Sequence, residues 1–401
     1  MKKLVSIAAI KIGMFVSGVT KSDSKLTVKS QGIIKSQATI DSLVARGILE
    51  LEIDLQKSQY QSDIQQNTLP KTNTLITASR LAKKIITFEQ HQNDLAVADR
   101  LYTEARAIHT RFVTQLKSGQ APDFASLQAL SQDIIDSVFD NCDALACLVM
   151  LKESNDYLIE HSLNCSILMS FFAHHKGFSQ AEIKDLTLAG LLMNCGMALL
   201  PSDLTQRTDN FSSVDVTLMR THIDIGIELT QRFAELSPTV ADIMANHHER
   251  LDQTGYPKQK HADDISVYAK MAAIVDCYDA MLTDRPFRTS TSAHEALELM
   301  RKDKCLDNKL VEEFIEAIGL FPVGSLVHLQ SGQLAIVAQR NAKDPLKPKV
   351  VTFYDTNHMH NTDMKRIDLM TQSSDKIIGS VTPEEFNINL LGFFRSVLLP
   401  T

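Results

Sequence analysis

Several features are scarce or absent in this 401-residue chain. It has no tryptophan, and its 15 glycines and 11 prolines are too few for long disordered tracts. No stretch approaches the roughly 18 consecutive apolar residues of a membrane-spanning helix, so we expect no membrane span. The apolar run at residues 4–10 ends at Lys11 without a cleavage pattern, and we interpret it as part of a strand rather than a signal peptide.

An excess of positive charge is also missing. The 41 Lys and Arg residues against 48 Asp and Glu residues give a net charge of −7, which argues against a binder of nucleic-acid polymers. A small basic pocket for one nucleotide remains open. The six cysteines include no CxxC pair, and most lie in apolar helical patterns. We therefore expect free thiols in a cytoplasmic protein, with neither a disulfide framework nor a cysteine zinc site.

Hydrophobic periodicity divides the sequence into four regions. Residues 1–74 combine strand-like alternation with a polar linker, and residues 75–142 form a helical connector. Residues 143–321 are a train of helices with clear start signals, such as the capping box from Ser179 to Glu182. Residues 322–401 contain short strands and a tail. The pattern predicts a mainly α fold with a small N-terminal α/β domain and a short C-terminal β appendage.

Candidate metal ligands lie on the helical region. Imidazole and carboxylate ligands together suit Zn, Fe or Mn, and the candidates are His161, His222, His247, His248 and Asp276. Adjacent residues on a helix point about 100° apart, so we expect His247 and His248 to act together only in a wide or multinuclear site. Any one of these histidines taken alone fits a surface or core position better. The set gains meaning only if the fold brings its members together.

The run His247 to Pro257, HHERLDQTGYP, resembles the signature of the HD-GYP family. These proteins are bacterial phosphodiesterases of the HD phosphohydrolase superfamily that hydrolyse cyclic di-GMP. Residues 276–288 and 321–325 resemble later blocks of the family, and residues 13–54 resemble the small domain that often precedes it. The resemblance implies a helical HD-type phosphohydrolase domain and metal ligands at the five positions above. It leaves Arg285 and Arg288 either as phosphate-binding groups or as part of a solvated loop.

The centre of the family's site is altered in this sequence. The family pattern LLHDxGKxxxP corresponds to LLMNCGMALLP at residues 191–201. Met193 stands at the position of the dyad His, Asn194 at that of the dyad Asp and Met197 at that of the Lys. Gln253 replaces a glycine, and Tyr157 occupies the position of a Glu that some members use for a third metal. In the family the dyad Asp bridges two metal ions, whereas an amide carries no charge and a thioether is a soft ligand.

Three hypotheses follow from this mixture of loss and retention. The lost dyad favours a non-catalytic signalling module that binds cyclic di-GMP or a partner, such as a diguanylate-cyclase-type domain docking on Gly255, Tyr256 and Pro257. The retained ligands favour a metal-dependent cyclic di-GMP phosphodiesterase that yields pGpG or GMP. In that case we expect one Fe, Mn or Zn ion rather than two, held by His222, His247 and His248. The third hypothesis is a structural interaction protein whose N-terminal domain carries the function.

Overall fold

A computed structural model describes most of the sequence after residue 87. The described ranges there are 88–150, 156–205, 211–233, 235–283, 289–341, 343–371, 375–386 and 388, with short segments between residues 2 and 54. The protein divides into two compact units, Met1–Arg80 and Leu81–Thr401, each of which is described by itself. Arg285 and Arg288, the predicted phosphate-binding residues, lie outside the described residues.

The first unit contains a small antiparallel sheet. Its strands lie in the order β1-β4-β2-β3, with bounds Lys2–Ser6 (β1), Phe15–Ser22 (β2), Gly32–Ile33 (β3) and Ile48–Asp54 (β4). In β4, Leu51 and Ile53 are fully buried and alternate with glutamates, as a half-buried strand requires. Their partners in this small core are Ile10, Val16, Ile34 and Ile40.

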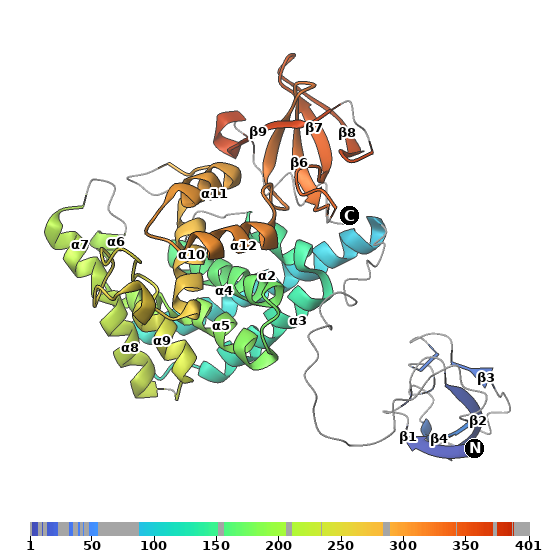
Figure 1. Ribbon diagram of the computed structural model, residues 1–401. Coiled ribbons are helices and arrows are strands. Elements are labelled where there is room, and N and C mark those ends of the chain that lie inside the picture. Colours follow the sequence, from blue (N-terminus) through green and yellow to red (C-terminus); the bar gives the residue numbers. More distant parts are fainter. Residues whose placement is uncertain are drawn as a thin grey trace. The chain divides into compact units, whose positions relative to one another are not determined.

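The second unit is built around a bundle of long helices (Figure 1). The first four are α2 (Phe88–Lys117), α3 (Phe124–Val149), α4 (Tyr157–His175) and α5 (Gln180–Leu192). Helix α4 is buried over residues 159–173, as expected for a helix that is apolar nearly all round. Helices α2, α3, α5 and α10 pack against it. A residue on α4 is therefore held on several sides, and this helix carries His161.

Further helical elements follow α5 and form the surroundings of the predicted site. They are η2 (Cys195–Leu199), α6 (Ser202–Thr205), α7 (Ser213–Arg220), α8 (His222–Phe233), α9 (Pro238–Asn246), η3 (Ala262–Asp264), α10 (Val267–Met281), α11 (Ala293–Lys302) and α12 (Asn308–Ile318). The predicted capping box at Ser179 is present, and Ser237 caps α9 ahead of Pro238. These local signals set where α5 and α9 begin. Met193 and His247 are the residues at the C-terminal ends of these two helices.

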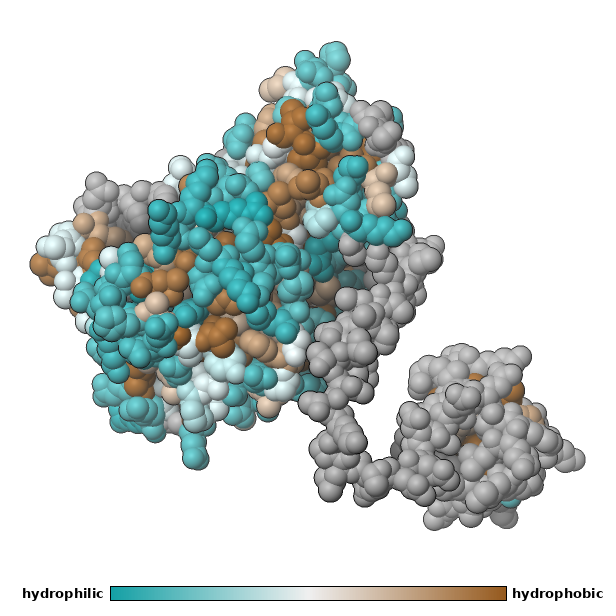
Figure 2. All heavy atoms as spheres, viewed as in Figure 1, coloured by the Kyte–Doolittle hydropathy of each residue, from teal (hydrophilic) through white to brown (hydrophobic). Residues whose placement is uncertain are grey.

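A five-stranded antiparallel sheet completes the second unit. Its order is β8-β7-β6-β5-β9, with bounds Leu326–Leu329 (β5), Gln333–Gln339 (β6), Lys349–Asp355 (β7), His360–Asp368 (β8) and Ile377–Val381 (β9), and η4 (Pro383–Phe386) follows it. Arg340, next to β6, pairs with Asp143 of α3 at 2.6 Å and so ties the sheet to the helices. On the face seen in Figure 2, hydrophobic residues gather over this sheet, whereas the helical part is a mosaic of both kinds.

The predicted fold class is confirmed. Helices dominate the second unit, the N-terminal sheet is small, and the C-terminal strands form their own sheet. The helices at residues 88–149 share one hydrophobic core with the helices that follow, so they are part of the main body. In the part of the sequence that the structure describes, no helix combines the length and the apolar composition that crossing a membrane requires.

Candidate metal centre

His222 is the first residue of α8 and is almost fully buried. Its Nδ1 lies 2.7 Å from the carbonyl oxygen of Met219, so Nδ1 carries the proton and donates it. The other ring nitrogen, Nε2, is then an acceptor with a lone pair. Among the described residues this buried Nε2 has no hydrogen-bond partner. An imidazole fixed through one nitrogen and unpaired at the other is typical of a metal ligand.

His247 repeats this arrangement at the C-terminal end of α9. Its Nδ1 lies 3.2 Å from the carbonyl oxygen of Ile243 and 3.1 Å from that of Met244, both on the last turn of the helix. Its Nε2 is also buried and has no partner among the described residues. Leaving an acceptor buried and unpaired costs free energy, about 1–3 kcal/mol for a neutral group. Two such nitrogens side by side therefore point to a bound cation.

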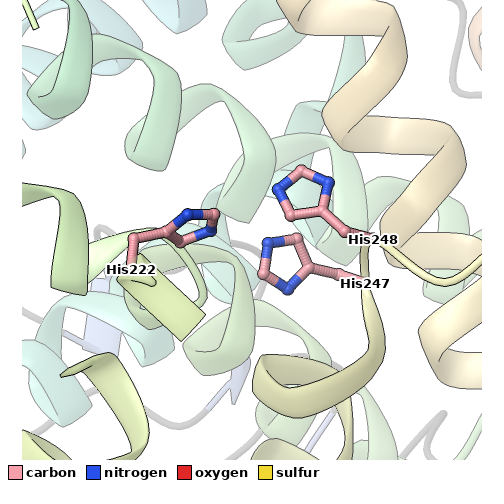
Figure 3. A group of neighbouring side chains, drawn as sticks. All are labelled: His222, His247 and His248. Carbon is pink, nitrogen blue, oxygen red and sulfur yellow. The ribbon is translucent and has the colours of Figure 1, made fainter. Parts of the chain in front are cut away.

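His248 completes a group of three histidines. Ligand nitrogens of His222, His247 and His248 all lie within 4.8 Å of one another, and Figure 3 shows the three rings converging on one space. Helix α9 ends at Asn246, and His247 caps it with helical backbone angles and an N–H bonded to the carbonyl oxygen of Ile243. That His247 and His248 act together only in a wide or multinuclear site therefore stays a prediction.

Burial sets the charge of these rings. Desolvation lowers the pKa of His247 to about 4, lowers the pKa of His222, and lowers the pKa of His248 well below its ordinary value. All three are therefore neutral near pH 7, which is the form that binds metal. The donor set fits a divalent ion with three imidazoles and further positions for water or a ligand.

The other predicted ligands form a second group, which is already paired. His161 Nδ1 lies 2.7 Å from Oδ2 of Asp279, and His161 Nε2 lies 3.0 Å from Oδ1 of Asp276. Burial by itself lowers the pKa of His161, but its surroundings, including these two hydrogen bonds, raise it well above the ordinary value. Burial likewise opposes the charge of Asp276, yet the hydrogen bond from His161 holds the pKa of this carboxyl well below its usual range. The group is a buried imidazolium between two carboxylates.

Asn194, which is predicted to stand at the position of the dyad Asp, joins this second group. Its Nδ2 donates to Oδ1 of Asp276 at 3.0 Å, and the residue is 2% exposed. Met193, at the C-terminal end of α5, is 1% exposed and belongs to the hydrophobic core. Met197 is half-buried in η2. Asp276 is thus satisfied by an amide and an imidazolium, both supplied by the protein itself.

Three residues near the second group were not identified from the sequence. Asn164 donates to Oδ1 of Asp279 at 2.9 Å and accepts from the hydroxyl of Tyr102 at 3.0 Å. Cys165 Sγ lies 3.8 Å from both ring nitrogens of His161. The only signal in the sequence was spacing, since Asn164 and Cys165 follow His161 by three and four residues on one helix.

The predicted GYP loop lies directly against the histidines. Tyr256 stacks on the ring of His248, with centroids 4.7 Å apart and planes 22° from parallel. A Cβ on Gly255 would lie 2.4 Å from the backbone nitrogen of Arg250, so only glycine fits there. Gln253 keeps a left-handed φ of 65°, the conformation for which the family's glycine is suited.

Comparison with known families matches three segments of the sequence. Residues 146–310 match an HD domain, residues 2–127 match a domain of unknown function (DUF3391), and residues 326–389 match a KOW domain associated with HD domains. The HD domain contains both groups described above. The protein therefore belongs to the HD-domain proteins, whose sites are metal-dependent. Its HD domain lies between an N-terminal DUF3391 domain and a C-terminal KOW domain of the kind associated with HD domains.

Individual relatives match this sequence over different extents. The protein is 28% identical to the cyclic di-GMP phosphodiesterase PA4108 of Pseudomonas aeruginosa over 98% of this sequence and 95% of that protein. It is 24% identical to the cyclic di-GMP phosphodiesterase PdeB of Borreliella burgdorferi, a match covering 50% of this sequence and 53% of the relative. Among solved structures, Bd1817 of Bdellovibrio bacteriovorus, an HDG"Y"P protein, is similar with a TM-score of 0.46 and 15% identity, covering 78% of this protein and 98% of that one.

Proposed function

We propose that this protein acts in cyclic di-GMP signalling, that its HD-GYP site does not perform two-metal hydrolysis, and that it works by binding the nucleotide or a partner protein. The observation that carries the proposal is the hydrogen bond from Asn194 to Asp276. At the position where the family has a bridging carboxylate, this protein has a donor. A donor satisfies Asp276 without a metal ion and cannot offset the repulsion between two dications.

The state of His161 supports the same proposal. Both of its ring nitrogens are engaged by carboxylates, so binding a metal through either one would require breaking a buried charged pair. Such a break costs about 3–5 kcal/mol when the partner stays uncompensated. Met193 does little to offset that cost, because a thioether binds Zn, Fe and Mn poorly. His161, Cys165 and Asp276 place ligand atoms within 4.8 Å of one another, but a metal ion could bind there only after the hydrogen bonds of His161 to the carboxylates were broken.

The alternative is an enzyme with one metal ion. The unpaired Nε2 atoms of His222 and His247 and the names of the relatives favour this alternative. A divalent ion held by three imidazoles supplies a Lewis acid and lowers the pKa of a bound water. Around it, the protein would hold the rings neutral by burial and orient two of them through backbone carbonyls. What it lacks is a second cation and the lysine position, now Met197, to meet the phosphate.

Metal content and turnover measured on the same protein separate these proposals. Anaerobically purified full-length protein is analysed for Fe, Mn and Zn and then assayed with cyclic di-GMP in the presence of added Mn²⁺ or Fe²⁺. We expect no more than one metal per molecule and no release of pGpG or GMP. Two metals per molecule with turnover would overturn the proposal, and one metal with turnover would establish the single-metal alternative.

A matched variant tests the reason for the inactivity. Met193→His with Asn194→Asp restores the two dyad side chains, and we expect it to bind more metal and to gain hydrolysis. His247→Ala in the same background serves as the control that should lose the gained activity. Titration of cyclic di-GMP into the wild-type protein by calorimetry then tests the binding role. Absence of nucleotide binding would leave partner binding, with a diguanylate-cyclase-type domain as the protein to test.

A further inference from the structure

The three histidines are not oriented by the same means. Backbone carbonyls fix His222 and His247 through their Nδ1 atoms. In the described part of the protein, His248 has no such carbonyl bond. Its Nδ1 lies 3.9 Å from Oδ2 of Asp276, beyond the reach of a hydrogen bond. Something other than a hydrogen bond must therefore set the direction of its ring.

The His248 ring also contacts the rings of His247, 4.2 Å away and tilted by 41°, and His222, 5.2 Å away and nearly perpendicular. Among the described residues its stacked partner is Tyr256. The two rings lie 4.7 Å apart and 22° from parallel, which is a stacked pair. The guanidinium carbon of Arg220 lies 4.7 Å from the centroid of the same tyrosine ring, a cation–π contact. The Tyr256 ring thus contacts both Arg220 and His248, and we call these three residues the 220–256–248 stack.

The loop that carries Tyr256 is anchored to the histidine pair itself. The backbone nitrogen of Tyr256 donates to the carbonyl oxygen of His248 at 3.1 Å. The buried carboxylate of Glu249 accepts from the backbone nitrogens of Lys258 at 2.7 Å and Lys260 at 3.0 Å. The base of the loop is therefore rigid, and the position of the tyrosine ring is well determined relative to His248.

The other end of the stack belongs to a much less protected element. Arg220 is the last residue of α7, a helix with no buried residue. Val214 on the same helix is 72% exposed, and hydrophobic atoms appear at the edge of Figure 2 where α7 runs in Figure 1. His222 begins the next helix two residues after Arg220. The segment from Arg220 to His222 therefore carries both a candidate metal ligand, His222, and the arginine that contacts Tyr256.

We propose that Tyr256 and Arg220 are positioning residues for His248, so that the GYP loop and α7 set the geometry of the three-histidine site. The inference rests on the proposed cation site at His222, His247 and His248. It predicts that losing the tyrosine ring weakens cation binding even though no ligand is removed. Changes in groups that orient a ligand typically alter metal affinity about 10–100-fold.

The test uses Co²⁺ as the probe, with affinity measured on the full-length protein by its visible absorption and by competition with Zn²⁺. Tyr256→Ala should weaken Co²⁺ binding by about 10–100-fold, while Tyr256→Phe, which keeps the ring, should bind like the wild type. Arg220→Ala should show a smaller loss in the same direction. Val214→Ala, on the exposed side of the same helix, is the matched control and should leave the affinity unchanged.

A metal-free measurement keeps this inference separate from the cation site. In the apo protein labelled at histidine, the His248 ring protons should show an upfield ring-current shift that persists in Tyr256→Phe and disappears in Tyr256→Ala. If the wild type binds no Co²⁺, the proposed cation site fails, and the ring-current comparison still decides whether the stack orients His248. Wild-type affinity and unmoved His248 signals in Tyr256→Ala, with normal thermal unfolding, would overturn the inference.

Discussion

Replacing Asn194 by Asp tests the physical basis of the altered dyad most directly. The substitution changes the side chain from amide to carboxylate with almost no change in shape. The amide Nδ2 now donates to Oδ1 of Asp276 at 3.0 Å, with both residues buried. After the change, two carboxylates face each other at that distance. The hydrogen bond is lost and like-charge repulsion takes its place.

The magnitude follows from these two terms. A hydrogen bond to a charged group contributes about 1.5–3 kcal/mol, and its loss leaves Asp276 with the imidazolium of His161 as its remaining partner in the group. Two unit charges about 3 Å apart repel strongly even at an effective dielectric constant near 20, so the pair relieves part of this by holding a proton. We expect Asn194→Asp to lower the free energy of unfolding by about 3 kcal/mol at pH 7. For a domain of this size that corresponds to a melting temperature lower by about 6–12 °C.

The assay is thermal unfolding followed by circular dichroism, with EDTA and then with excess Mn²⁺. A divalent ion bridging the two carboxylates would restore stability, by about 2.7 kcal/mol at 100-fold excess over its Kd. The variant should therefore gain more from Mn²⁺ than the wild type does. Asn194→Leu, which removes the hydrogen bond without adding charge, is the control and should lose less than the Asp variant. If the Asp variant matches the wild type in EDTA, the account of how Asp276 is satisfied is wrong.

Three further predictions concern other parts of the same unit. Burial lowers the pKa of His109 from 6.5 to about 4, so the folded protein favours the neutral ring. The contribution of this ring to the free energy of unfolding is complete above pH 6.5 and is lost as the pH drops toward 4. The loss amounts to about 3 kcal/mol. His109→Gln should flatten the unfolding free energy measured between about pH 7.5 and pH 4.5, and an unchanged slope would refute the assignment. Gly196→Ala should lower the melting temperature and the metal content together, because its Cβ would collide with the carbonyl oxygen of His222 and lie 2.7 Å from the nitrogen of Gly226. Gln253→Gly should raise the free energy of unfolding by up to about 1 kcal/mol in urea titrations, since φ at this position is 65°; a loss of stability would show that the Gln side chain makes a compensating contact.

Much of the helical architecture could be predicted because its signals are local. The capping box at Ser179, the cap at Ser237 and the proline after it mark helix starts within a few residues of each other in the sequence. The candidate ligands could be named from the resemblance to the HD-GYP family, which the run from His247 to Pro257 carries most clearly. The same resemblance predicts that Met193, Asn194 and Met197 replace the dyad and the lysine, because the two leucines, the glycine and the proline of the pattern are kept.

The pairing within the site could not be predicted. His161 and Asp279 are 118 residues apart, and Asn194 and Asp276 are 82 residues apart, so no local pattern connects them. The expectation for His247 and His248 assumed a continuing helix, whereas α9 ends at the residue before His247 and His247 is its C-terminal cap. Helix ends are the least predictable part of a helix, so the relative direction of these two rings could not be derived from the sequence.

By itself, then, the sequence determined the fold class, since that depends on residue identity and short-range spacing, and its resemblance to the HD-GYP family predicted the ligand positions and the altered dyad. Only the tertiary structure decided which nitrogens carry protons, because that depends on which carbonyls and carboxylates the packing brings within about 3 Å. It divided the predicted ligands into a group of three neutral histidines, two of them with unpaired nitrogens among the described residues, and a group whose members are hydrogen-bonded to one another. The first group therefore offers unpaired nitrogens to a cation, whereas the second would have to break hydrogen bonds to bind one.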